Sequence, residues 1–330
     1  MTVKRRRALG ETMDVLSDIL DVLKMRSAVY FRAELASPWR VEIPGEAQVM
    51  RFHLILSGRC VLKLDTEPTE YALGAGDLMV VPHGATHTLG DTAGPAELTI
   101  ERFLELVGFD GHGPLRYVGG EDGETTTMVC GHVAFESGAD HPFFEQLPSV
   151  LFLRAAEIPA EPWLSEAIRL FAAETQRESP GRQAMLNRLS EIVFIHVLRA
   201  HATRSERSSG LMRGLVDEAI ARSLRAIHQR PAEEWSLDVL ARHVGLSRSR
   251  FAERFKEVVG IAPMGYLTIW RMEKARRWLV ESRASVAELA ERVGYQSLPA
   301  FTRAFKRRFG VGPGTFRRRT ATSSSLSGEA

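Results

Sequence analysis

The chain has 330 residues, of which 44% are hydrophobic and 25% are charged, as expected for a globular protein of two or three domains. Its apolar runs are shorter than the ~20 residues of a membrane span, and the basic start MTVKRRRALG lacks the apolar stretch of a secretory signal. The two cysteines, Cys60 and Cys130, exclude a disulfide framework and suit a reducing cytoplasm, where we expect the protein to work without a membrane partner.

The net charge of +2 conceals a strong difference between two parts of the chain. Residues 210–319 hold 22 Lys and Arg against 11 Asp and Glu, whereas residues 11–209 hold 17 against 29. A basic C-terminal third on an acidic body is the pattern of a protein that binds phosphate backbones. A solvated basic face would give the same counts, so charge alone does not identify the partner.

From about residue 27 to residue 155, short β-type runs alternate with turns rich in Gly, Pro and Asp. The runs are RFHLILSG, CVLKLD, GDLMVVPHG, AELTIERFLELVG and TTTMVCGHVAFESG. Short strands at regular spacing predict a small β-barrel or jelly roll. We assign residues 11–160 to this domain, as an effector-sensing barrel, and expect residues 1–10 to form a disordered basic tail.

One stretch of the expected barrel, GDLMVVPHGATH, resembles the second cupin motif, with Gly76, Pro82, Gly84 and His87 at the motif's spacing. The resemblance implies a cupin-like β-barrel in which the Pro-x-Gly turn directs His87 into the interior, where a metal can bind. The first cupin motif would supply two more histidines and a glutamate. The corresponding stretch here, PGEAQVMRFHLILSG, offers only His53, so oxygenase or isomerase chemistry is not expected.

The run MVCGHVAF offers a different set of ligands. Cys130 and His132 are two residues apart on an expected strand and therefore share a face, which would place them with His53 and His87 if that face is the interior. Imidazole and thiolate suit Zn²⁺ or another divalent metal. The same side chains would equally line a polar pocket for a small-molecule or redox effector, because a thiolate can be oxidised. We expect His83, on the motif's turn, to face solvent.

The hydrophobic period becomes helical after the barrel. Leu164, Ile168 and Phe171 recur at helical spacing, and further apolar residues do so after the break ESPG. We predict an antiparallel helix pair over residues 161–202 that relays a signal or carries a homodimer contact. A packing layer beneath the barrel is the alternative. A polar linker is expected over residues 203–213.

The basic third contains an internal repeat. The stretch SLDVLARHVGLSRSRFAERFKEVVGIAP, beginning at Ser236, aligns with SVAELAERVGYQSLPAFTRAFKRRFGVGP, beginning at Ser285. Each copy has an apolar helix, a turn at Gly245 or Gly294, and a second helix that carries two phenylalanines. This is the anatomy of a helix-turn-helix. Ser285 and Glu288 have the spacing of a capping box, which marks where the second copy begins.

The repeat resembles the signature of the arabinose-operon regulator (AraC/XylS) family over about residues 215–318. The residues that carry the resemblance are Gly294, Tyr295, Ser297, Phe301, Arg303, Phe305, Lys306, Gly310 and Pro313. We therefore assign residues 214–319 to an AraC-type DNA-binding domain and residues 320–330 to a disordered tail. Residues 14–200 resemble the cupin-like sensor domain of one branch of the same family. The expected fold class is α+β and multidomain: an N-terminal cupin-like β-barrel with a helix pair, followed by an all-α double helix-turn-helix.

The resemblance implies that the second helix of each copy enters the major groove. It places base-reading positions at Ser249, Ala252 and Glu253 in the first copy and at Thr302 and Arg303 in the second. The same helices would contribute Ser297 and Ala300, and we expect phosphate contacts from Arg250, Arg271, Lys306 and Arg307.

These features predict a bacterial, nucleoid-associated transcription regulator, not an enzyme, whose binding to double-stranded DNA responds to an effector and which acts with RNA polymerase. The alternative is a cupin-type metalloenzyme with a helical appendage. The incomplete first motif argues against it, and the sequence has no Gly-rich phosphate loop or nucleophile elbow. An architectural DNA-binding protein would leave the barrel unexplained.

Overall fold

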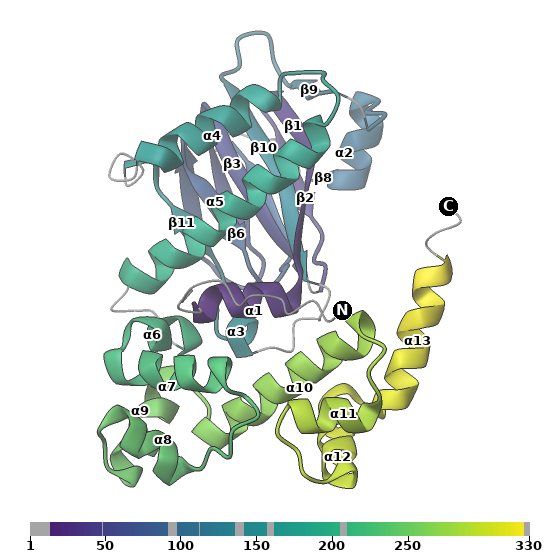
Figure 1. Ribbon diagram of the computed structural model, residues 1–330. Helices are drawn as coiled ribbons and strands as arrows, with labels where there is room; N and C mark the ends of the chain where they lie inside the picture. The colour runs from purple at the N-terminus through teal and green to yellow at the C-terminus, as the bar shows by residue number, and fades with distance from the viewer. Residues whose placement is uncertain are drawn as a thin grey trace. The chain divides into compact units, whose positions relative to one another are not determined.

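A computed structural model describes residues 14–47, 49–91, 98–111, 113–135, 142–156, 162–204 and 210–326 (Figure 1). The chain divides into two compact units, Lys24–Ser208 and the combination of Met1–Leu23 with Ser209–Ala330. The basic tail expected at residues 1–10 lies outside the described residues. Within the described ranges, no helix is both long and apolar enough to cross a membrane.

The unit Lys24–Ser208 is built on two β-sheets. The order of strands is β11-β6-β3-β10-β1-β9 in the larger sheet and β5-β4-β7-β2-β8 in the smaller one. The strands are β1 (Met25–Ala36), β2 (Arg40–Ile43), β3 (Val49–Ser57), β4 (Arg59–Leu64), β5 (Glu70–Gly74), β6 (Leu78–Val81), β7 (His87–Gly90), β8 (Leu98–Thr99), β9 (Leu115–Val118), β10 (Thr125–Phe135) and β11 (Leu151–Leu153). This β-rich unit confirms the predicted barrel.

The alternation of strand side chains separates an interior from an outer face. Ile55, Leu62 and Val81 belong to the buried apolar core of the barrel. Phe52, next to His53 on β3, lies on the outer face, where its ring meets that of Phe171 with 6.5 Å between centroids.

The helix pair predicted over residues 161–202 is present as α4 (Pro162–Glu174) and α5 (Arg182–Arg204). Both helices lie across one face of the larger sheet (Figure 1). Their buried side chains include Phe171 and Phe194. The pair therefore forms a packing layer on the barrel, which is the alternative stated for this segment. The expected linker 203–213 is shorter than predicted, because α5 continues to Arg204 and α6 (Gly210–Val216) begins at Gly210.

One expected strand proved to be a helix. The run AELTIERFLELVG forms only the two-residue β8 before α2 (Ile100–Val107) begins. The side chain of Thr99 caps the helix by accepting from the backbone N–H of Arg102, and Gly108 ends it with a φ of 62°. Ile100, Phe103, Leu104 and Val107 recur at helical spacing, which outweighs the β propensity of the first residues. A second short helix, α3 (Pro142–Glu145), precedes β11.

The other unit is all-helical. It contains α1 (Val15–Leu23), α6, α7 (Glu218–Gln229), α8 (Leu237–Val244), α9 (Arg248–Val259), α10 (Pro263–Glu281), α11 (Val286–Arg292), α12 (Leu298–Phe309) and α13 (Pro313–Leu326). The two predicted copies are α8 with α9 and α11 with α12, and α10 lies between them (Figure 1). Helix α13 continues to Leu326, past residue 320 where a disordered tail was expected.

The turns of the two copies confirm the interpretation of the repeat. Gly245 and Gly294 have φ angles of 75° and 84°, in the left-handed region that glycine adopts without strain. Ser285 and Glu288 form the predicted capping box, with both reciprocal hydrogen bonds present.

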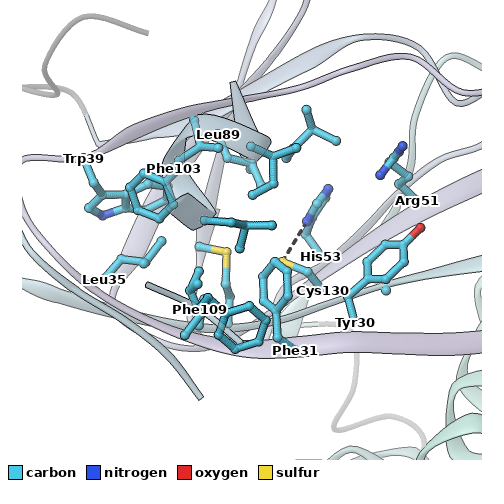
Figure 2. A pocket seen from close by; sticks show the side chains of 18 residues that line it. Tyr30, Phe31, Leu35, Trp39, Arg51, His53, Leu89, Phe103, Phe109 and Cys130 are labelled. Carbon is cyan, nitrogen blue, oxygen red and sulfur yellow. Dashed lines mark hydrogen bonds between the residues drawn. The ribbon is translucent and has the colours of Figure 1, made fainter. Parts of the chain in front are cut away.

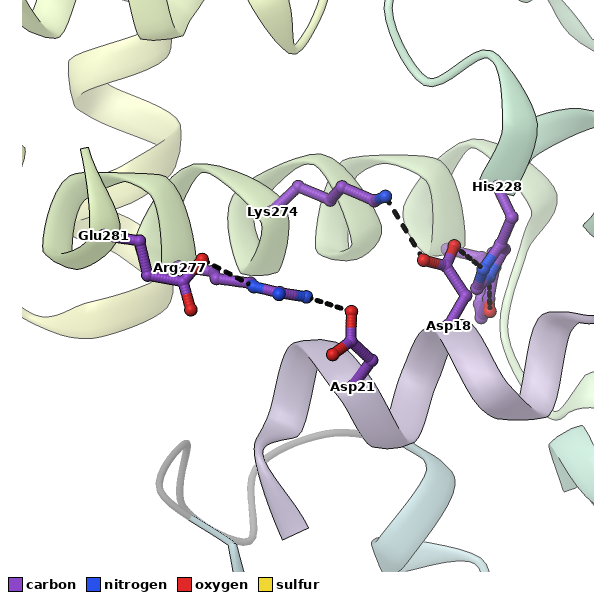
Figure 3. Close-up of polar contacts among 7 residues, drawn as sticks. Asp18, Asp21, His228, Lys274, Arg277 and Glu281 are labelled. Atoms are coloured by element: carbon purple, nitrogen blue, oxygen red, sulfur yellow. Dashed lines mark hydrogen bonds and ion pairs between the residues drawn. The ribbon is translucent and has the colours of Figure 1, made fainter. Parts of the chain in front are cut away.

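Helix α1 packs within the helical unit, although it falls within residues 11–160, which were predicted to form the barrel domain. Its apolar face, which includes Ile19 and Leu23, is fully buried. Its polar side meets α7 and α10: Asp18 contacts His228 and Lys274, and Asp21 contacts Arg277 (Figure 3). The amphipathic pattern of a nine-residue helix shows that one face is buried but not what covers it.

Candidate functional site

The second helix of each copy is anchored on one face and exposed on the other. On α9, the fully buried Phe251 and Phe255 fix the inner face. Of the residues expected to contact DNA on α9, Ser249, Arg250 and Glu253 are exposed and Ala252 is half-buried.

Helix α12 repeats this arrangement. Phe301 and Phe305 are fully buried. On the outer side, Ser297, Arg303, Lys306 and Arg307 are exposed, and Ala300 and Thr302 are half-buried. The hydroxyl of Ser297 accepts from the backbone N–H of Ala300 at 3.5 Å and so caps the helix.

The two exposed faces differ in free positive charge. On α9, Arg248 is paired with Asp238 at 3.4 Å and Arg254 with Asp217 at 2.8 Å. On α12, the three cations Arg303, Lys306 and Arg307 have no ion pair among the described residues. Helix α12 therefore presents more uncompensated positive charge, which suits contact with phosphates and guanine.

Arg271 does not fit the phosphate-binding role expected of it. Its guanidinium donates to the backbone carbonyls of Pro231, at 2.7 Å, and Glu233, at 2.8 Å. It also lies over the ring of Tyr295, with 5.9 Å from Cζ to the centroid. These contacts hold the turn before α8 against α10, so Arg271 has a structural role.

A cavity of about 390 Å³ lies in the barrel unit (Figure 2). Its walls are mostly apolar, and they include residues of α2, the helix that was mistaken for a strand. The residues that line it are Tyr30, Phe31, Ala33, Leu35, Trp39, Val41, Ile43, Arg51, His53, Leu89, Ile100, Phe103, Leu104, Phe109, Leu115, Met128, Cys130 and Gly131. Its size lies in the range of small-molecule sites.

His53, His87 and Cys130 come together as predicted. Because β3 pairs with β10, His53 stands opposite Cys130, and its Nδ1 lies 3.3 Å from the Sγ atom. The Nε2 atom of His53 lies 2.9 Å from that of His87, whose Nδ1 is 2.8 Å from the carbonyl oxygen of Ala85.

The carbonyl of Ala85 sets the direction of the two hydrogen bonds nearest to it in this series. The carbonyl of Ala85 can only accept, so Nδ1 of His87 carries the proton and its Nε2 accepts from His53. The remaining nitrogen of His53 then accepts from the Cys130 thiol. Every link is satisfied when the two rings are neutral and the thiol is protonated.

Burial favours the same neutral forms. It lowers the pKa of His87 to about 4 and raises the pKa of the Cys130 thiol to about 12. The pKa of His53 lies well below its ordinary value, because of burial first and the neighbouring His87 second.

Among the described residues, His53, His87 and Cys130 form a hydrogen-bonded series and not an arranged set of metal ligands. On binding a metal, His53 and His87 would give up the hydrogen bonds that they accept, and Cys130 would lose its proton. In the part of the chain that the structure describes, no group of three or more His, Cys, Asp or Glu side chains is arranged to hold a metal ion. His53 and Cys130 form a small polar region in the wall of the mostly apolar cavity, whereas His87 is fully buried and does not line it.

His132 and His83 lie away from this hydrogen-bonded series. His132 does not line the cavity; its ring lies beside that of Tyr30, with 4.9 Å between centroids. His83 is exposed, as expected, and its Nε2 lies 2.8 Å from the carbonyl oxygen of Leu147.

Arg51 and Tyr30, which were not predicted from the sequence, also line the cavity. Arg51 precedes His53 by two residues on β3, so strand periodicity places both on one face. That periodicity would have identified Arg51 as an inward-facing charge.

Comparisons with known proteins identify a cupin domain and a helix-turn-helix domain in this chain. The cupin family model matches residues 14–203, and a helix-turn-helix domain model matches residues 240–319. The chain is 31% identical to a "Putative AraC-like transcription regulator" of Streptomyces antibioticus, over 93% of this chain and 99% of that protein. It is 29% identical to the HTH-type transcriptional regulator AlkR of Acinetobacter baylyi, over 93% of this chain and 100% of the relative. Among solved structures, the DNA-binding domain of AdpA in complex with a target DNA is 29% identical, over 34% of this chain and 99% of that one, with a TM-score of 0.31.

Proposed function

This chain belongs to the family of AraC-like transcription regulators and carries a cupin domain, and on that premise we propose that a ligand in the barrel cavity controls how the double helix-turn-helix binds DNA. The chain is a DNA-binding transcription regulator, not an enzyme. The observation that carries the proposal is that one chain combines a mostly apolar cavity with the uncompensated cations of α12.

Helix α12 is the main reading element in this proposal. Arg303 forms paired hydrogen bonds with a guanine, and Lys306 and Arg307 contact phosphates. Helix α9 contributes the exposed Glu253, which accepts from a cytosine amine, and Arg250, which contacts a phosphate. Because its other arginines are paired within the protein, α9 supplies less of the affinity than α12.

The effector acts by shifting a population. A small molecule in the cavity changes DNA binding only if it binds one arrangement of the two units more tightly than the other. Of these three residues, His53 and Cys130 line the cavity, and the sulfur of Cys130 is a weak acceptor for such a molecule.

We further propose that the regulator forms a homodimer through α4 and α5. Trp163 and Leu170 on α4, and Met185 and Ile192 on α5, are each seven residues apart and between 41% and 48% exposed. Residues seven apart share a helix face, so each helix carries an apolar stripe toward solvent. We place the regulator on operator DNA in the bacterial cytoplasm, with RNA polymerase as its partner in transcription.

The experiment that tests the DNA-binding role is selection of duplexes from a random library by the full chain, followed by fluorescence anisotropy across a salt series. The wild type should recover one sequence, and its affinity should fall steeply with salt because phosphate contacts release counterions. Arg303→Ala should relax the preference at one base pair at a cost of roughly 1–3 kcal/mol, and Lys306→Ala should lower the salt slope by about one unit. The matched control is Arg59→Gln, an exposed arginine of the barrel. A shallow salt slope, or equal binding of all sequences, would contradict the proposal.

A further inference from the structure

We infer that Arg271 is a positioning residue for DNA recognition: it holds the two helix-turn-helix copies in one relative orientation, so that the protein accepts its two blocks of base pairs at only one separation. The inference rests on the proposed function, because it requires α9 and α12 to contact the same duplex. It adds a constraint on the DNA that neither reading helix imposes by itself.

Helix α10 is shared by the two copies, and Arg271 lies near its middle. Toward the first copy, the ring of Tyr266 meets that of Phe255 on α9, with 6.0 Å between centroids. Toward the second copy, Met272 belongs to a buried apolar cluster with Phe301 and other residues of α11 and α12. A shared helix sets the distance between the copies. Because a long helix can bend along its length, their relative orientation needs contacts away from the helix axis.

The guanidinium of Arg271 reaches the loop that leads into the first copy. This loop, residues 230–235, precedes Ser236, the N-cap of α8. The Nε atom of Arg271 donates to the carbonyl of Pro231 at 2.7 Å, and its Nη2 donates to the carbonyl of Glu233 at 2.8 Å. Two bonds from different nitrogens of one planar group fix the orientation of the loop as well as its distance from α10.

The same guanidinium contacts the turn of the second copy, residues 294–296. Its Cζ atom lies 5.9 Å from the centroid of the Tyr295 ring, a cation–π contact. That ring meets the ring of Phe301 on α12, with 5.6 Å between centroids. Arg271 therefore connects the loop before α8 to the reading helix α12 through one aromatic side chain.

The loop and the turn also contact each other directly. Gly294 approaches Ala232 so closely that an added Cβ atom would lie 2.8 Å from the backbone of Ala232. The side-chain amide of Gln296 donates to the carboxylate of Glu234. Loop, turn and Arg271 together form a junction between the copies. Because its contacts lie away from the axis of α10, the junction resists a bend of that helix and a rotation of one copy against the other.

A fixed orientation of the copies selects one spacing on DNA. Two reading helices enter the same face of a duplex when the base pairs that they contact lie about one helical turn apart, roughly 10 base pairs. One added base pair rotates the second block by about 35° around the duplex axis. A rigid pair of copies cannot follow this rotation, so one of the two helices loses its base contacts.

The test uses the duplex that the full chain selects from a random library, together with two duplexes in which one base pair is added or removed between the blocks. Glu253→Ala and Arg303→Ala identify the blocks, because each variant should relax the preference at the base pair that its helix contacts. Fluorescence anisotropy gives the affinity for each duplex. The wild type should bind both altered duplexes roughly 30-fold or more weakly, because the base contacts of one helix are lost. This ratio is the spacing penalty.

Arg271→Ala should reduce the spacing penalty roughly five-fold or more, and weaken binding to the selected duplex, because the copies are no longer held in the binding orientation. Arg271→Lys should give an intermediate penalty, since an ammonium group lacks the planar fork that bonds two carbonyls. Glu234→Ala removes the bond to Gln296 and should reduce the penalty to a smaller extent. The matched control Arg277→Ala removes another arginine of α10, which bonds to Glu281 at 2.8 Å, and should leave the penalty unchanged.

The spacing penalty separates positioning from a simple loss of stability. A destabilised domain binds all three duplexes more weakly without a change in their ratio, and this result for Arg271→Ala would overturn the inference. If Arg271→Ala does not fold, an unchanged ratio in both Arg271→Lys and Glu234→Ala would overturn it. A wild type that prefers one sequence but tolerates every spacing would overturn the inference and leave the proposed function standing. A wild type without any sequence preference would contradict the proposed function itself.

Discussion

The carboxylate of Asp18 and the imidazole of His228 are joined at 2.9 Å, although 210 residues separate them in the chain. His228 is fully buried, its ring stacks on Trp270 with 3.8 Å between centroids, and its Nε2 accepts from the hydroxyl of Tyr266 at 2.6 Å. Asp18 also pairs with Lys274 at 3.3 Å, so one carboxylate ties α1 to both α7 and α10 (Figure 3).

The Asp18→Asn variant should destabilise the helical unit by about 1–3 kcal/mol, because the ion pair with Lys274 and the charge-assisted bond to His228 are lost. Asp21→Asn, which removes a 65% exposed partner of Arg277, should cost well under 1 kcal/mol. Burial raises the pKa of Asp18, but His228 and Lys274 more than offset this and hold it below the ordinary 3.8. In urea unfolding, the gap between wild type and Asp18→Asn should therefore persist at neutral pH and close only below pH 3.8.

The Ile19→Ala variant tests where α1 belongs. Ile19 is fully buried within the helical unit, so its truncation should cost roughly 3 kcal/mol. Hydrogen exchange should become faster in α7 and α10 and stay unchanged in β3 and β10. Faster exchange confined to the barrel would show that α1 stabilises the barrel. The control is Leu106→Ala, at a position 61% exposed.

The neutral His53–His87 pair predicts that the barrel loses stability in acid. The pKa of His87 falls from 6.5 to about 4 on folding, mainly through burial, so below pH 6.5 the unfolded chain binds a proton that the folded chain does not. This one histidine should lower the free energy of unfolding by on the order of 3 kcal/mol between pH 6.5 and pH 4. His87→Gln should flatten the pH dependence of denaturant unfolding, whereas the exposed His83→Gln should not.

The two turn glycines should differ in their tolerance of alanine. Gly245→Ala meets no atom within 4 Å and should cost only the strain of a left-handed residue, roughly 1 kcal/mol. At Gly294, a Cβ atom would lie 2.8 Å from the backbone of Ala232 and from the Arg271 guanidinium, so Gly294→Ala should cost roughly 3 kcal/mol. Thermal unfolding of the two variants measures the difference. Equal costs would show that the backbone at Ala232 shifts at little cost to accommodate the added methyl group.

The apolar stripes of α4 and α5 predict the behaviour of Ile192→Glu. If the stripes form the homodimer contact, a charge at this position should convert the protein to a monomer in sedimentation velocity. Leu106→Glu, at an equally apolar and 61% exposed position on α2, should leave the association state unchanged. A wild type that sediments as a monomer at all concentrations would rule out this contact.

The sequence by itself determined the features that depend on local periodicity. The repeat, its capping box and its two glycine turns were all predicted, because caps, turns and helical spacing involve residues within a few positions of one another. The cluster of His53, His87 and Cys130 was also predicted, since strand alternation and the cupin motif direct these side chains inward. The helix over Ile100–Val107 was missed because its first residues favour a strand as well.

Only the tertiary structure decided which partners the buried groups have. It placed α1 against α7 and α10, gave Arg271 to two backbone carbonyls, and excluded His132 from the cavity that Arg51 enters. An amphipathic or alternating pattern states that a face is buried, but the partner lies on a segment far away in the sequence. That pairing depends on how complementary surfaces pack in three dimensions. The periodicity of a single segment contains no information about its distant partner.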